Sequence, residues 1–126
     1  MPASDIRKYQ ARASSTDTFG RVLCSVRNHH YVIDGPEQNG CPGEEVTPGE
    51  LLLSAVASCG VELVQVLAKS QGIPLRGIAV DINGWMDRSK PVRSDVSLFN
   101  SVSLQFQMNG VTDADAKHLV EAFKGR

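Results

Sequence analysis

The residue with the clearest chemical potential is Cys59, a single thiol in the middle of an apolar stretch. It lies in TPGELLLSAVASCGVELVQVLAKSQG, residues 47–72 of a 126-residue chain. A cysteine thiolate is a nucleophile that peroxides oxidise to a sulfenic acid, but forming it at neutral pH takes a nearby cation, a hydrogen-bond donor or a helix N-terminus. Cys59 is expected about three turns into a helix, beyond the reach of the helix dipole. The alternative is a buried cysteine that packs like a small apolar residue, the usual state of a free thiol.

Charged residues elsewhere in the chain could tune this thiol. Glu62 follows Cys59 by three positions and lies on a neighbouring helix face. Alone, its carboxylate would raise the pKa of the thiol by like-charge repulsion, so it would help only by orienting an arginine over the sulfur. Otherwise Glu62 belongs to the polar stripe of the helix. Arg12, Arg21 and Arg27 could supply the cation from N-terminal strands, and each could equally be a solvated surface arginine.

Glu50 is explained by the start of the helix. It precedes Cys59 by nine residues, which places it roughly 180° around the helix and about 13 Å along its axis. Thr47 suits the N-cap, Pro48 suits the first helical position, and Glu50 completes a capping box with Thr47. We therefore assign Glu50 to the cap.

The remaining cysteines and the histidines have plainer explanations. Cys24 alternates in step with Val22 and Val26 and is expected in the core, whereas Cys41, followed by Pro42, is expected to be an exposed loop cysteine. The alternative for Cys41 is that it reaches Cys59 across a dimer. His29-His30 would point to opposite faces of a strand, so no metal site is expected. Nothing indicates a cofactor, since the chain has no glycine-rich phosphate loop.

Composition narrows the class of protein. There are 13 basic and 14 acidic residues, for a net charge of −1, so no nucleic-acid partner is expected. No signal peptide is visible, and an odd number of cysteines without a leader indicates free thiols in a reducing, cytoplasmic compartment. Polar residues interrupt the longest apolar window, so no membrane span is expected: Ser54, Ser58, Glu62 and Gln65. The length predicts a single domain over 1–126.

Hydrophobic periodicity predicts the elements that position these residues. We expect strands at 9–13, 22–26, 31–34, 76–86 and 101–108, with Asn28-His29 near the turn of the first hairpin. A glycine- and proline-rich loop at 35–46 leads into a helix from Pro48 to about Ser70, and a final helix follows the cap Thr112. Strands, long helix, strands and helix make an α+β layout. The long helix is apolar around most of its circumference, which points to a second subunit covering it.

Several motifs together resemble the OsmC/Ohr family, the osmotically inducible and organic-hydroperoxide-resistance proteins. They are Asp34, Gly40, TPGELLLSAVASC (47–59), AKSQGIPL (68–75) and IAVDINGWMD (78–87). The resemblance implies an intertwined homodimer, with the cysteine-bearing helices at its centre and sheets from both subunits around them.

The resemblance also implies peroxidase chemistry, and the chain departs from it at three points. Family peroxidases carry a glutamate where this chain has Gly49, and a G-R-x-G-R pattern of which only Gly20-Arg21 is kept, with Thr18 in the earlier arginine's place. Their second cysteine, in a Cys-Pro pair beside the last helix, has no counterpart. Two explanations stay open: the domain over 1–126 lacks the family's C-terminal end, or this member has no resolving thiol.

The resulting hypothesis is thiol-dependent reduction of organic hydroperoxides, with a dithiol as reductant. Cys59 would be the nucleophile, Arg21 would stabilise the thiolate and the departing oxyanion, and Glu62 would orient the arginine. The rival hypothesis is a non-peroxidase OsmC-like dimer that binds an apolar small molecule in the groove between its subunits. A structural or stress-associated partner protein is the third alternative.

Overall fold

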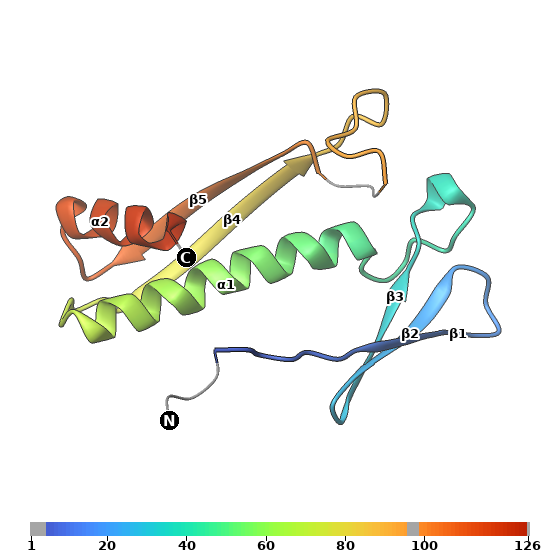
Figure 1. Ribbon diagram of the computed structural model, residues 1–126, viewed down its shortest axis with the longest axis horizontal. Coiled ribbons are helices and arrows are strands. Elements are labelled where there is room, and N and C mark those ends of the chain that lie inside the picture. The colour runs from blue at the N-terminus through green and yellow to red at the C-terminus, as the bar shows by residue number, and fades with distance from the viewer. Residues whose placement is uncertain (1–4, 96–98, 126) are drawn as a thin grey trace. The chain divides into compact units, whose positions relative to one another are not determined.

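The computed structural model describes residues 5–95 and 99–125 and confirms the α+β class (Figure 1). The chain divides into two compact units, Met1–Leu51 and Leu52–Arg126, and each is described by itself. Their elements, in chain order, are β1 (Arg12–Ser15), β2 (Arg21–Val26), β3 (His29–Asp34), the short 3-10 helix η1 (Glu37–Asn39), α1 (Pro48–Ser70), β4 (Gly77–Trp85), β5 (Ser101–Asn109) and α2 (Asp113–Lys124).

The first unit contains an antiparallel sheet in the order β1-β2-β3. Val26 pairs with His29, so the turn lies at Arg27-Asn28, one residue before the predicted position, and Arg27 takes a positive φ of 53°. The first strand also begins later than predicted, at Arg12 instead of residue 9. The two buried residues of β3 are Ile33 and Asp34, at its end.

The boundaries of α1 are those predicted, and specific caps set them. Thr47 N–H donates to Glu50 Oε1 at 3.0 Å, and Glu50 N–H donates to Thr47 Oγ1 at 3.3 Å, which completes the capping box. At the other end, Gly72 has a φ of 67° and donates its N–H to Lys69 O, while Ile73 N–H donates to Ala68 O at 2.9 Å. These two bonds form a Schellman motif that ends the helix.

The second unit packs its part of α1 and α2 on one face of the β4–β5 hairpin. The hairpin register runs from the Gly77–Asn109 pair to the Trp85–Ser101 pair, close to the predicted strand limits. Thr112 Oγ1 accepts the N–H of Asp115 and caps α2 as predicted. Alternate hairpin residues face a core whose fully or nearly fully buried members are Val64, Leu67, Ala68 and Leu119, with Ile78, Phe106, Met108 and Phe123 packed against it.

The apolarity of α1 exceeds the sequence-based expectation. By length and composition alone, this helix could cross a membrane, so the prediction that no stretch reaches that apolarity is wrong. Serine lowers the mean hydropathy only slightly, and Glu62 is the only charged residue between Leu51 and Ala68. The result is weak evidence for a membrane, because the central helix of a water-soluble protein passes the same test.

Candidate functional site

Cys59 lies on the exposed side of α1, in a stripe of mostly apolar residues. Exposed positions recur at steps of three and four along this side, and we call them the Cys59 stripe: Leu52, Ala55, Cys59, Glu62 and Val66. Leu52 and Val66 are 48% and 46% exposed. The thiol is therefore accessible in the single chain, and it does not pack in the chain's own core.

The residue after Cys59 fixes which way the helix faces. Gly60 is buried, and a Cβ added there would lie 3.4 Å from the ring of Phe106 and 3.7 Å from that of Phe123. The two rings form an edge-to-face pair with centroids 5.6 Å apart. Because both rings lie at ordinary contact distance from this position, the Gly60 face turns to the core and the Cys59 stripe turns away from it.

Glu62 lies one turn beyond Cys59 and is exposed. Within residues 5–95 and 99–125, neither the Glu62 carboxylate nor the Cys59 thiol has a hydrogen-bond or ion-pair partner. Both groups are therefore free to meet a substrate or another chain. The orienting role of Glu62 toward an arginine stays a proposal.

Arg21 is held in the first unit by a buried carboxylate. Its Nε and Nη2 donate to Asp34 Oδ1 and Oδ2, each at 2.8 Å, and Nη2 also lies 3.4 Å from Glu44 Oε1. Asp34 has no exposed surface, and its Oδ2 accepts the N–H groups of Glu44 and Glu45. The hydrogen bonds from Arg21 hold the pKa of Asp34 well below its ordinary value, and the same pairing raises the pKa of Arg21.

Sequence reasoning named Arg21 but missed Asp34 as its partner. The register places the two opposite each other on β2 and β3. The available signal was an acidic residue facing a basic one across a hairpin, but a turn at Asn28-His29 would have placed Pro36 opposite Arg21. Arg21 still keeps one guanidinium nitrogen, Nη1, without an acceptor in the described part of the chain.

The other two cysteines, Cys24 and Cys41, lie in the core and in a loop. Cys24 is 7% exposed, which confirms its prediction as a core residue. Cys41 is half-buried, because its side chain packs against Gly20 and Gly35, where an added Cβ would collide with the sulfur. The expectation of an exposed loop cysteine is therefore wrong.

His29 and His30 lie on β3, and His30 has a close polar partner. His30 Nδ1 lies 2.8 Å from Ser25 Oγ, its neighbour across the β2–β3 ladder. Across the described ranges, no group of three or more histidine, cysteine, aspartate or glutamate side chains could hold a metal ion.

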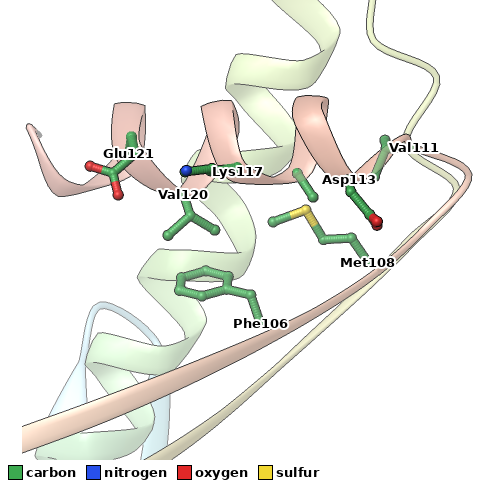
Figure 2. A pocket seen from close by; sticks show the side chains of 8 residues that line it. Phe106, Met108, Val111, Asp113, Lys117, Val120 and Glu121 are labelled. Atoms are coloured by element: carbon green, nitrogen blue, oxygen red, sulfur yellow. The ribbon is translucent and has the colours of Figure 1, made fainter.

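A cavity of about 410 Å³ lies between β5 and α2 in the same unit as Cys59 (Figure 2). Figure 2 shows Phe106, Met108 and Val120 turned toward one another beneath α2, with charged residues along the helix. Its full lining is Phe106, Met108, Val111, Asp113, Ala116, Lys117, Val120 and Glu121. The cavity is a second candidate site, suited to a molecule with apolar surface.

Comparison with known proteins gives one family. The family model described as OsmC-like protein matches residues 41–126. No curated protein matches the chain.

Solved structures share the fold at low sequence identity. An OsmC-like protein from Mycoplasma pneumoniae is 15% identical with a TM-score of 0.78, covering 95% of this chain and 82% of its own. An organic hydroperoxide resistance protein OsmC from Legionella pneumophila is 18% identical with a TM-score of 0.75, covering 97% and 85%. A putative organic hydroperoxide resistance protein from Vibrio cholerae, with captopril bound in one of its active sites, is 15% identical with a TM-score of 0.64, covering 98% and 83%.

Proposed function

Because the chain belongs to the OsmC-like family, we propose that it reduces organic hydroperoxides with Cys59 as the nucleophile. The observation that carries this proposal is the position of the thiol, which is exposed between the apolar side chains of the Cys59 stripe. Apolar neighbours suit the alkyl or aryl group of an organic peroxide. The hydroperoxide-resistance proteins among the similar structures are consistent with this activity.

The proposed reaction has two stages. The Cys59 thiolate attacks the terminal peroxide oxygen, an S–O bond forms, and the O–O bond breaks. The sulfur is oxidised to a sulfenic acid, and the departing alkoxide takes a proton to become an alcohol. A dithiol then attacks the sulfenic sulfur, water leaves, and the second thiol of the reductant displaces Cys59 as a thiol from the mixed disulfide.

Arg21 and Glu62 keep the supporting roles in this proposal. Arg21 stabilises the thiolate and the alkoxide, and its unpaired Nη1 leaves donors for that purpose. Asp34 positions Arg21, so Glu62 is needed only as a second orienting group near the sulfur. Glu62 has no other partner in the described ranges that would explain its place among apolar residues.

The proposal includes a cytoplasmic homodimer. In the single chain, apolar residues of α1 are exposed to solvent, and only 17% of its most apolar window is buried. A second copy would bring an identical helix with the same uncovered stripe. Burial of Leu52 and Val66 against the second copy, with the sulfur still open to the peroxide, would also lower the local dielectric around Cys59, which strengthens the effect of a nearby cation.

The rival function is binding of an apolar small molecule without turnover. Gly49 and Thr18 stand where peroxidases of the family carry charged residues, and the cavity between β5 and α2 offers a site with apolar walls and a charged rim of Asp113, Lys117 and Glu121. This reading predicts ligand binding that does not depend on Cys59.

Peroxide consumption separates the two functions. Cumene hydroperoxide is mixed with dithiothreitol and the native chain, Cys59→Ser, Cys24→Ser or Cys41→Ser, and the remaining peroxide is followed with time. The proposal predicts that Cys59→Ser falls to the rate without protein, while Cys41→Ser stays active. Equal rates for the native chain and Cys59→Ser would exclude Cys59 as the nucleophile.

A further inference from the structure

A second cavity, of about 320 Å³, lies where α1 ends and β4 begins. Its apolar wall comes from Ala68, Ile73 and Leu75, all of which belong to the core of this unit or pack against it. Lys69 and Arg76 also line it, and no carboxylate does. This charge pattern differs from that of the cavity between β5 and α2, whose lining holds Asp113 and Glu121 beside Lys117.

The wall of this cavity is built by the helix cap. The Schellman bond from Ile73 N–H to Ala68 O places Ile73 beside the last turn of α1. Gly72, at a φ of 67°, permits the sharp reversal, and Pro74 restricts the segment that follows. The apolar surface is therefore formed before any ligand arrives.

Hydrogen bonding to the carbonyl groups of Leu67, Ala68 and Lys69 does not account for the Lys69 side chain. A lysine near a helix C-terminus often donates hydrogen bonds to the last carbonyl groups of the helix. Here backbone donors already satisfy three of them, since Gln71, Ile73 and Gly72 donate to the carbonyls of Leu67, Ala68 and Lys69. Lys69 has no acidic partner within the described ranges.

Arg76 is held in place by the backbone around it. Its N–H donates to Asn109 O at 2.9 Å, and its Cγ and Nε lie over Gly110, each 2.9 Å from where a Cβ would stand. Its guanidinium has no carboxylate partner in the described part of the chain. An arginine whose stem lies over Gly110 and a lysine thus stand beside an apolar wall, and neither has a carboxylate partner in the described ranges.

We propose that this cavity binds a small carboxylate with an apolar tail. The carboxylate accepts hydrogen bonds from Lys69 and Arg76, and the tail lies along Ala68, Ile73 and Leu75. Both parts are required, because the cations favour an anion and the wall favours removal of hydrocarbon from water. The site is independent of Cys59 and of its chemistry.

The probe for this site is sodium octanoate, titrated into the full chain by calorimetry. The apolar and anionic parts are tested separately with 1-octanol and with acetate. The variants are Lys69→Gln, Arg76→Gln and their combination, and the matched control is Lys117→Gln, which removes a cation from the other cavity. All three side chains are exposed, and circular dichroism checks that each variant folds.

The proposal predicts saturable octanoate binding that the double variant weakens about tenfold or more. The control Lys117→Gln should retain native affinity, and backbone amide shifts in ¹H–¹⁵N spectra should centre on Ile73, Leu75 and Gly77. Absence of saturable octanoate binding would overturn the proposal. So would equal binding of 1-octanol or acetate, or an equal loss of affinity in Lys117→Gln.

Discussion

Asp34, which has no exposed surface, accepts two hydrogen bonds of 2.8 Å from Arg21 across the β2–β3 ladder. The same carboxylate receives the N–H groups of Glu44 and Glu45, so one side chain connects the sheet to the loop that precedes α1. A planar guanidinium matches a carboxylate in this two-bond geometry. The pair therefore orders both the hairpin and the approach to the long helix.

Acid should destabilise the protein through Asp34. Its folded-state pKa lies below the ordinary value of 3.8, so its contribution to stability is fully present above that value and is lost as the pH falls through the lower folded-state pKa. We expect the unfolding midpoint in urea to fall steadily below about pH 4. Urea titrations between pH 2 and pH 6 measure it, and Asp34→Asn should flatten the dependence; an unchanged slope in that variant would contradict the assignment.

Loss of the Arg21 charge should lower the melting temperature more than replacement of Arg21 by lysine. Arg21→Met leaves the buried Asp34 carboxylate without its cation, so we expect a fall on the order of 10 °C or more. Arg21→Lys keeps the charge but cannot donate two parallel hydrogen bonds, so its fall should be smaller. Differential scanning calorimetry at pH 7 compares the two, with exposed Arg88→Met as control. Equal melting temperatures for the native chain and Arg21→Met would show that the pair does not stabilise the fold.

Truncation of Leu119 should identify the core of the second unit. This side chain is fully buried among Val64, Leu67 and Ala68. Leu119→Ala removes apolar contacts and leaves a cavity, at an expected cost of about 2–5 kcal/mol in the free energy of unfolding. Val92→Ala, at a 58% exposed position, should change it by less than about 0.5 kcal/mol. Urea denaturation measures both, and similar costs for the two would place the core elsewhere.

Charges placed on the Cys59 stripe should separate the proposed dimer. We expect the native chain to sediment at twice its 13.6 kDa mass. Leu52→Glu combined with Val66→Glu would bury like charges in an interface between two α1 helices, so this variant should sediment as a monomer. Gln105→Glu, on the exposed face of β5, is the control and should remain dimeric. Sedimentation velocity distinguishes these outcomes, and a monomeric native chain would refute the dimer.

Neutralisation of Glu62 should affect rate without affecting stability. Its carboxylate is exposed and has no partner in the described ranges, so Glu62→Gln should melt within about 2 °C of the native chain. An orienting residue acts through the arginine, so the rate of peroxide consumption should fall by less than the ~100-fold typical of losing a direct donor. An unchanged rate would show that Glu62 has no role in the reaction and is only part of the polar stripe of α1.

The helices could be predicted from local signals, whereas one strand register could not. Thr47 and Glu50 predict the start of α1, and Gly72 with Pro74 predicts its end, because capping interactions involve residues within about one turn of the helix end. The β2–β3 turn was misplaced by one residue, since Arg27 adopts a positive φ that its residue type does not signal. Because of this one-residue error in the turn, the Arg21–Asp34 pair could not be predicted.

The sequence names Cys59, Arg21 and Glu62 as candidates for the site, but it does not give their geometry. Cys59 stood out in sequence, but its exposure depends on which side of α1 packs on Phe106 and Phe123. Cys41 was misjudged because its cover comes from Gly20 and Gly35, which are distant in sequence from the motif around it. Such contacts arise from tertiary packing, and no local pattern encodes them.

The most direct test of the account is to locate the oxidised sulfur. The native chain receives one equivalent of cumene hydroperoxide, a dimedone reagent traps sulfenic acid, and peptide mass spectrometry identifies the labelled cysteine. The account predicts the label on Cys59, with cumyl alcohol formed in equal amount. Unconsumed peroxide, or a label confined to Cys24 or Cys41, would contradict it.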